Sequence, residues 1–134
     1  MLVIGSKEWK EAIKTRSKKQ YSLLKDYYQR MPDQMPERRK VLAEVKIFAG
    51  IHNQNRALFE KGLRDWKTHT MAYLDMFEDD ENFTCYRQVF DNGEIQVHHK
   101  KEGALVAIGE LIKNKRNYHE FIAEQLDEMN WWDS

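Results

Sequence analysis

The histidines of this sequence are the residues with the most scope for chemistry, because histidine can act as a base, an acid or a metal ligand near neutral pH. A single cysteine, Cys85, excludes an internal disulfide and a cysteine-based zinc site. No glycine-rich phosphate loop, nucleophile elbow or Cys-His zinc pattern is present. A catalytic site would therefore use the five histidines and their polar neighbours. They are His52, His69, His98, His99 and His119.

The histidines of the C-terminal half loosely resemble an HNH nuclease, with His98-His99 followed by Asn114 and then His119. The resemblance implies that His98 or His99 activates water, that Asn114 orients this base, and that His119 helps to hold one divalent metal ion. Adjacent strand residues point to opposite faces, so one of the two neighbouring histidines would serve. The resemblance also implies a loop and a strand over residues 100–108, where the local pattern predicts the start of a helix.

A second resemblance lies in the spacing of Arg64 and His69, which is the Arg-x4-His spacing of HEPN ribonucleases. It implies that paired Arg and His side chains line a dimer cleft and act on a 2′-hydroxyl and a phosphate. That family is all-helical, whereas this sequence also predicts a β-hairpin. His52, Asn55 and His69 are further apart than one helical turn, and we interpret them as residues that set packing register instead of a metal site.

Basic residues dominate the N-terminal part of the chain. Residues 1–50 contain twelve Lys/Arg and six Asp/Glu, a net charge of +6, and the remainder contains ten and sixteen, a net charge of −6. Such a split predicts a basic surface for nucleic acid or an acidic protein, or head-to-tail association between copies. A solvated lysine face is the alternative. The predicted binding residues are Lys7, Lys10, Lys14, Arg16, Lys18, Lys19, Lys25, Arg38, Arg39 and Lys40.

The stretch Glu37–Asp79 carries His52, His69 and three of the predicted basic residues, and its apolar residues recur at helical spacing. A continuous helix of this length would be ~64 Å long, beyond the ~36 Å expected for a compact domain of this size. Two interpretations stay open, because the helix is either continuous and covered by a partner, or broken near Gly50. The predicted self-association or packing seam consists of Phe48, His52, Asn55, Phe59, Trp66, His69 and Tyr73.

The remaining elements complete a fold that is mainly α with one β-hairpin. A first helix is predicted from Ser6 as N-cap to Met31, before Pro32, and it forms a helical hairpin with the long second helix. Residues 83–101 are predicted to form a β-hairpin. Its Asn92-Gly93 turn would place Gln88 opposite Val97 and Tyr86 opposite His99, with the apolar face on the helices. A C-terminal helix over residues 104–130 leads to Trp131 and Trp132, which either pack on the hairpin or anchor a partner.

Composition indicates one ordinary globular domain over residues 1–134, with 41% hydrophobic and 33% charged residues. The single cysteine and the lack of a signal peptide or membrane span predict a cytoplasmic protein with no membrane partner. No cofactor or metal is implied. The absence of convergent catalytic groups favours a non-enzymatic interaction or assembly protein that forms a homo-oligomer or binds another protein. A small HNH-like metal-dependent endonuclease is the alternative, followed by a HEPN-like ribonuclease.

Overall fold

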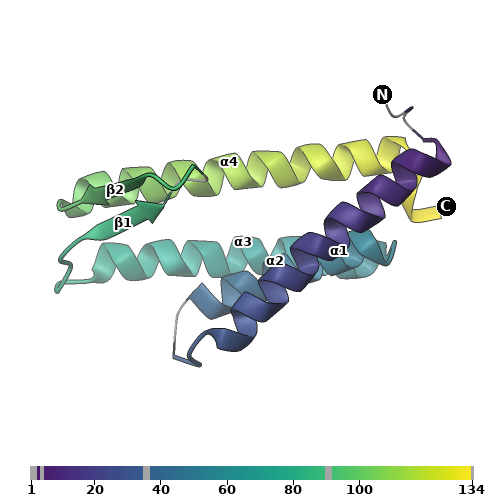
Figure 1. Cartoon of the computed structure of the whole chain (residues 1–134). Coiled ribbons are helices and arrows are strands. Elements are labelled where there is room, and N and C mark those ends of the chain that lie inside the picture. The colour runs from purple at the N-terminus through teal and green to yellow at the C-terminus, as the bar shows by residue number, and fades with distance from the viewer. Residues whose placement is uncertain (1–2, 4, 35–36, 90–91, 134) are drawn as a thin grey trace.

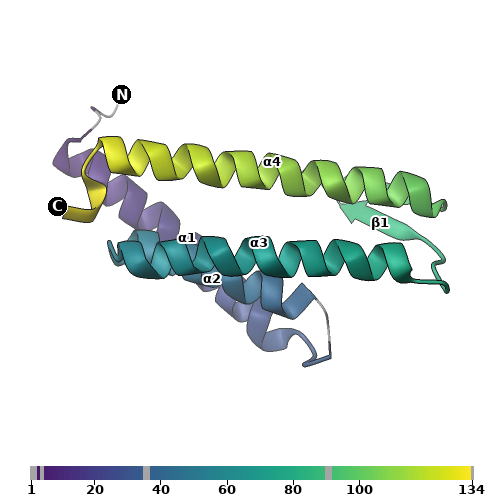
Figure 2. The same cartoon turned by 180° about the vertical axis from the view of Figure 1, so that it is seen from behind.

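The computed structural model describes residue 3 and residues 5–34, 37–89 and 92–133. These residues confirm the predicted fold class, mainly α with one β-hairpin, and they contain no helix long and apolar enough to cross a membrane. Helices α3 and α4 lie side by side and antiparallel, and α1 crosses the molecule obliquely (Figures 1 and 2). In chain order the elements are α1 (Lys7–Arg30), α2 (Glu37–His52), α3 (Arg56–Asp79), β1 (Tyr86–Val89), β2 (Ile95–His98), α4 (Lys101–Glu128) and the 3-10 helix η1 (Trp131–Asp133).

Helix α1 begins and ends where the sequence predicts. The side-chain oxygen of Ser6 accepts a hydrogen bond of 3.2 Å from the backbone nitrogen of Trp9, which caps the N-terminus. Met31 is extended because the residue before a proline is disfavoured in the helical conformation. Helices α1 and α2 pack together as the predicted helical hairpin (Figure 1). The link between them at residues 35–36 lies outside the described residues.

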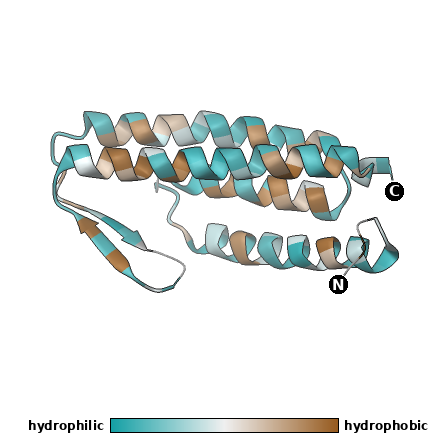
Figure 3. Ribbon diagram, turned by 90° about the horizontal axis from the view of Figure 1, so that it is seen from above, coloured by the Kyte–Doolittle hydropathy of each residue, from teal (hydrophilic) through white to brown (hydrophobic). Residues whose placement is uncertain are grey.

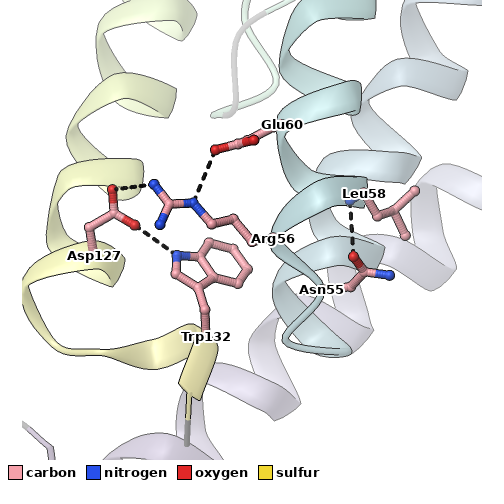
Figure 4. Close-up of polar contacts among 6 residues, drawn as sticks. All are labelled: Asn55, Arg56, Leu58, Glu60, Asp127 and Trp132. Atoms are coloured by element: carbon pink, nitrogen blue, oxygen red, sulfur yellow. Dashed lines mark hydrogen bonds and ion pairs between the residues drawn. The ribbon is translucent and has the colours of Figure 1, made fainter.

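The stretch 37–79 is two helices, so the continuous interpretation is wrong and the broken one is confirmed. Helix α2 ends at His52, and Gln54 takes a positive φ of 53° that reverses the chain. Asn55 then caps α3, since its Oδ1 accepts a hydrogen bond of 3.1 Å from the backbone nitrogen of Leu58 (Figure 4). Gly50 is not the cap but lies inside α2, two residues before its end.

Two glycines let α2 and α3 approach each other after the break. A Cβ added at Gly50 would lie 2.5 Å from the backbone nitrogen of Phe59, and one added at Gly62 would lie 2.7 Å from that of Ile47. Both distances are shorter than any normal contact, so these positions require glycine for the crossing. The break therefore converts one overlong helix into an antiparallel pair that buries its own apolar faces.

The predicted seam packs within this chain. Phe59, Trp66 and Tyr73 are buried, so they are not available to a second copy. His52 Nδ1 lies 3.0 Å from a backbone carbonyl oxygen of α1, and Asn55 is the cap of α3. These residues therefore pack or bond within this chain, whereas Phe48 and His69 are half-buried, and the predicted role of the set in self-association stays a prediction.

The C-terminal residues close one end of the core. The indole of Trp131 is fully buried, and its Nε1 donates a hydrogen bond of 3.0 Å to the backbone carbonyl of Ile51. Trp132 lies on Phe59, with ring centroids 5.1 Å apart, and donates to Asp127. Neither tryptophan packs on the β-hairpin, and a buried Trp131 cannot anchor a partner, so both predictions are wrong for Trp131. The hydrophobic cluster around it includes Ala43, Ile47, Ile51, Phe59, Trp66 and Leu126.

Figure 4 shows how this end is fastened between α3 and α4. Arg56, at the start of α3, bonds Glu60 through Nε at 3.0 Å and Asp127 of α4 through a terminal nitrogen at 3.3 Å. The same Asp127 carboxylate accepts a hydrogen bond of 2.9 Å from Trp132. These contacts are exposed, so each stabilises the fold by less than about 1 kcal/mol.

The β-hairpin forms, but its register differs by one residue from the prediction. Tyr86 pairs with His98 and Arg87 with Val97, instead of Tyr86 with His99 and Gln88 with Val97. The longer connection from Val89 to Ile95 explains the shift, although residues 90–91 lie outside the described part. A one-residue slip moves side chains to the opposite face. As a result, Ile95 and Val97 are exposed, and the hairpin projects from one end of the helices (Figure 3).

Helix α4 starts at Lys101 and ends at Glu128, compared with the predicted 104–130. It begins directly after β2, so no loop or second strand separates His99 from the helix. Ala104, Ile108, His119 and Leu126 are its buried residues. These four residues lie on one stripe of α4, which is bordered by the half-buried Ile112, Ile122 and Ala123, and the opposite side of the helix is exposed.

Candidate functional site

A cleft opens between α1 and α4, because α1 packs on α2 and diverges from α4 (Figure 1). The outer part of the cleft has a volume of about 470 Å³ and includes Arg16 and Gln20 of α1, Glu44 of α2, and Lys115 and Tyr118 of α4. An inner apolar pocket of about 110 Å³ continues from it towards the core. Side chains of all four helices line that pocket, among them Ile13, Ile47, Phe48, Phe59, Ile122 and Leu126.

One wall of the cleft is a polar group centred on Glu44. This side chain is buried, and its Oε1 accepts hydrogen bonds from Trp66 Nε1 at 3.2 Å and from Lys115 Nζ at 3.1 Å. The two donors satisfy a carboxylate that would otherwise be costly to bury. Lys40 lies close to Glu44 and Lys115, and burial first and then Lys115 lower the pKa of its ammonium group.

His119 joins the polar wall to the apolar pocket, since it lines both parts of the cleft. Its side chain is 7% exposed and packs edge-on against Trp66, with ring centroids 5.2 Å apart. Burial lowers the pKa of the imidazole, Glu44 raises it and Lys115 lowers it further, so the ring is neutral at pH 7. Nε2 is buried and has no hydrogen-bond partner among the described residues.

The cleft contains one cation that no carboxylate of the described residues neutralises. Glu44 and Lys115 neutralise each other, and Arg16 forms no ion pair within the described ranges. No group of three or more His, Cys, Asp or Glu in the described part of the chain could hold a metal ion. The cleft therefore combines the Arg16 cation, the neutral imidazole of His119 and an apolar pocket.

The histidines of the HNH-like pattern do not converge. His98 ends β2, stacks on Tyr86 at 6.1 Å and lines a shallow surface groove with Asn114. His99 is exposed in the short link before α4. His119 instead faces the cleft between α1 and α4. The structure thus brings His98 and Asn114 together and leaves His119 apart from them.

Arg64 and His69 of the HEPN-like pattern both lie on α3. Arg64 is exposed, whereas His69 is half-buried in a groove of about 550 Å³ where α1, α2 and α3 meet. Arg38 and Arg39 line this groove, and the Arg38 guanidinium lies 4.1 Å from the ring centre of Tyr28. His69 is therefore placed with basic residues other than Arg64.

The predicted basic set does not form one surface. Lys40 is held over the ring of Tyr73, 5.1 Å from its centroid, and Arg16 belongs to the cleft. Arg38 pairs with Asp33 at 3.4 Å. Among the predicted basic residues, Arg39 of α2 is exposed, whereas Lys10 and Lys14 of α1 are half-buried. The exposed members on α1 are Lys7, Lys18, Lys19 and Lys25, with Arg16 at the cleft.

Two helix faces remain uncovered in the described part of the chain. The outer face of α4, defined here as Leu111, Asn114, Tyr118 and Phe121, exposes 37% of Leu111, 52% of Tyr118 and 57% of Phe121. In Figure 3 the helix carries hydrophobic segments between hydrophilic ones along its length. The alternation of four- and three-residue steps from 107 to 121 was the signal that could have found this face.

The outer face of α1 is the second uncovered surface, defined here as Lys19, Leu23, Tyr27 and Arg30. Leu23 is 56% exposed and Tyr27 is 51% exposed, and both cations are exposed beside them. These four residues lie one helical turn apart and form one row. Comparison of the chain with protein-family models, curated proteins and solved structures gives no match. The function is therefore argued from the cleft and these two faces.

Proposed function

We propose that this chain is a non-enzymatic interaction protein that self-associates, with the outer face of α4 in one copy packed against the outer face of α1 in the next. The observation that carries the proposal is the row of large apolar side chains exposed along α4. Contiguous exposed apolar residues on a helix mark docking surfaces, because their burial removes apolar area from water.

The spacing of the α4 row is that of a helix-packing seam. Leu111 and Tyr118 are seven residues apart, as are Asn114 and Phe121, and the two pairs alternate at steps of three and four. This is the a/d pattern of helices that pack side by side. Asn114 interrupts the apolar row, and a polar residue at such a position sets the register of the pairing.

Charge favours another copy of this chain as the partner. Glu110 and Glu124 stand beside the outer face of α4, and Lys115, which also borders this face, is paired with Glu44. The α1 face instead includes Lys19 and Arg30, with Asp26 as one acidic neighbour, and residues 1–50 carry +6 against −6 for the rest. Opposite charges around two apolar rows fix orientation and accelerate association.

Because the two faces differ, the contact is heterologous, and each added copy leaves one face of each kind open. The exposed lysines of α1 also suit the phosphate backbone of nucleic acid, the partner that the basic set alone suggests. We favour the protein partner because two exposed apolar side chains lie in the centre of the basic face of α1.

Complementary face variants test the proposal by light scattering. One variant carries Leu23→Asp and Tyr27→Asp, and the other carries Leu111→Asp and Phe121→Asp. The parent should show masses above the monomer, each variant alone should be a monomer, and an equimolar mixture should form a dimer with one intact contact. Met71→Asp is the matched control, since Met71 is 54% exposed on α3 and belongs to neither face.

Salt provides the second measurement. Raising NaCl from about 50 mM to about 500 mM should reduce the mass of the parent, because the Debye length falls from roughly 14 Å to 4 Å. A monomeric parent, or a mixture that stays monomeric, would refute self-association through these faces. Binding of a single-stranded oligonucleotide with steep salt dependence by that monomer would assign the α1 face to nucleic acid instead.

A further inference from the structure

The cleft between α1 and α4 combines features that the self-association proposal does not use. Its inner pocket of about 110 Å³ has an apolar lining, and its outer part of about 470 Å³ carries the charged groups of Arg16, Glu44 and Lys115 on a partly apolar wall. Arg16 lines both parts. The two environments are therefore continuous, with the cation at their junction.

The charges in the cleft do not cancel. Glu44 is matched by Lys115, whose Nζ lies 3.1 Å from its Oε1, whereas Arg16 has no carboxylate within ion-pair distance among residues the structure describes. A guanidinium presents several N–H donors in a plane that matches a carboxylate. The unmatched charge favours an anionic group at the mouth of the pocket.

A second and independent observation is the unpaired nitrogen of His119. This side chain is 93% buried, yet its Nε2 lacks a hydrogen-bond partner in the described part of the chain. Buried polar atoms are almost always satisfied, so one that is not often marks a site where another molecule binds. His119 belongs to the walls of both parts of the cleft.

We propose that this cleft binds a small amphipathic monocarboxylate, with its carboxylate held by Arg16 and His119, which line both parts of the cleft, and its hydrocarbon part in the inner pocket. The inner pocket, at about 110 Å³, is smaller than the cavity of about 150 Å³ that binds benzene, so an unbranched alkyl chain suits it better than a ring. The site borders the outer face of α4, because Tyr118 belongs to that face and also lines both parts of the cleft.

Isothermal titration with octanoate, hexanoate and octan-1-ol tests the site on the full chain. Octanoate should bind, and each methylene removed should weaken binding about fourfold, from the transfer of ~0.8 kcal/mol per buried CH₂. Octan-1-ol should bind about fivefold more weakly than octanoate, which corresponds to ~1 kcal/mol for an exposed ion pair. Arg16→Gln should abolish this preference for the acid.

Two further variants make the outcome decisive. Lys18→Gln removes the same charge from the exposed side of α1 and should keep the preference for octanoate. Ser17→Leu inserts a larger side chain into the inner pocket and should abolish the dependence on chain length, with circular dichroism as the check of folding. Absence of octanoate binding, an unchanged preference in Arg16→Gln, or an unchanged chain-length dependence in folded Ser17→Leu would overturn the proposal. Light scattering reports self-association separately.

Discussion

Replacing Gly62 by alanine tests the helix crossing on which the fold depends. In a free helix the change is favourable, because alanine is a better helix former than glycine by about 1 kcal/mol. At this position the added Cβ would lie 2.7 Å from the backbone nitrogen of Ile47 and 3.0 Å from the backbone carbonyl oxygen of Ala43. Backbone atoms of a neighbouring helix cannot rotate away, so α2 and α3 must separate.

The size of the effect follows from these two opposing contributions. Overpacking of a core costs about 1–3 kcal/mol, and the upper end applies where the obstacle is backbone. Subtracting the gain of about 1 kcal/mol in helix propensity leaves a net loss of about 2 kcal/mol in the free energy of unfolding for Gly62→Ala. At about 4 °C for each kcal/mol, the melting temperature should fall by about 8 °C.

Gly109 of α4 is the matched control, since nothing lies within 4 Å of a Cβ built there. Gly109→Ala should therefore keep the propensity gain and raise the melting temperature by about 4 °C. Both variants are compared with the parent by thermal unfolding followed by circular dichroism. If the melting temperature of Gly62→Ala equals that of Gly109→Ala, then α2 and α3 do not cross closely at Gly62. That result would favour the alternative of a continuous helix over residues 37–79.

Three further predictions concern the break, the buried imidazole and the C-terminus. Asn55→Ala should cost about 1 kcal/mol in urea unfolding through loss of the N-cap, whereas an unbroken helix would gain stability from alanine. Burial holds the pKa of His119 below its usual 6.5, so the contribution of the neutral imidazole to stability is complete above about pH 6.5 and declines as the pH falls. The urea midpoint should therefore vary less with pH below 6.5 in His119→Phe than in the parent. An equal pH dependence in the two proteins would refute the buried, neutral state of His119. Trp131→Ala should cost about 3–5 kcal/mol and Trp132→Ala much less, since only Trp131 is fully buried; equal losses would contradict this packing.

The broken helix shows what apolar periodicity can and cannot predict. The poor helix formers at Gly50, His52, Asn53 and Asn55 correctly identified the region of the break. The apolar spacing keeps the same phase through this region. Each of α2 and α3 is amphipathic, so the spacing alone does not show that the chain folds back between them. Only the close approach at Gly50 and Gly62 shows that the two apolar faces meet, and such an approach has no periodic signal.

The β-hairpin shows a different limit. Asn92-Gly93 predicted a two-residue turn, and Gly93 does take a positive φ of 88°. The pairing of Val89 with Ile95 nevertheless places five residues between the strands. A longer turn changes the register by one residue, and the face of β2 that packs on the helices then changes from Ile95 and Val97 to His98.

Residues of the cleft were the hardest to predict, because their roles depend on the direction of α1. Glu44 reads as a solvated charge in an apolar stretch, yet α2 is packed on two sides and the carboxylate is buried. Lys115 belongs to the polar run Lys113–Asn117, whereas His119 falls at the helical spacing of the apolar residues of α4. They reach Glu44 only because α4 returns antiparallel to α3 and passes over α2 at that height.

A single geometric cause underlies both proposals. Helix α1 packs on α2 and diverges from α4, so α4 buries one stripe with Ala104, Ile108, His119 and Leu126. The divergence leaves the cleft on one side of this stripe and the apolar outer face of α4 beside it. Tyr118 stands at the boundary, lining the cleft while it is 52% exposed. A copy docked on α4 would therefore cover the rim of the cleft, so octanoate binding should weaken as the protein concentration rises through the association range.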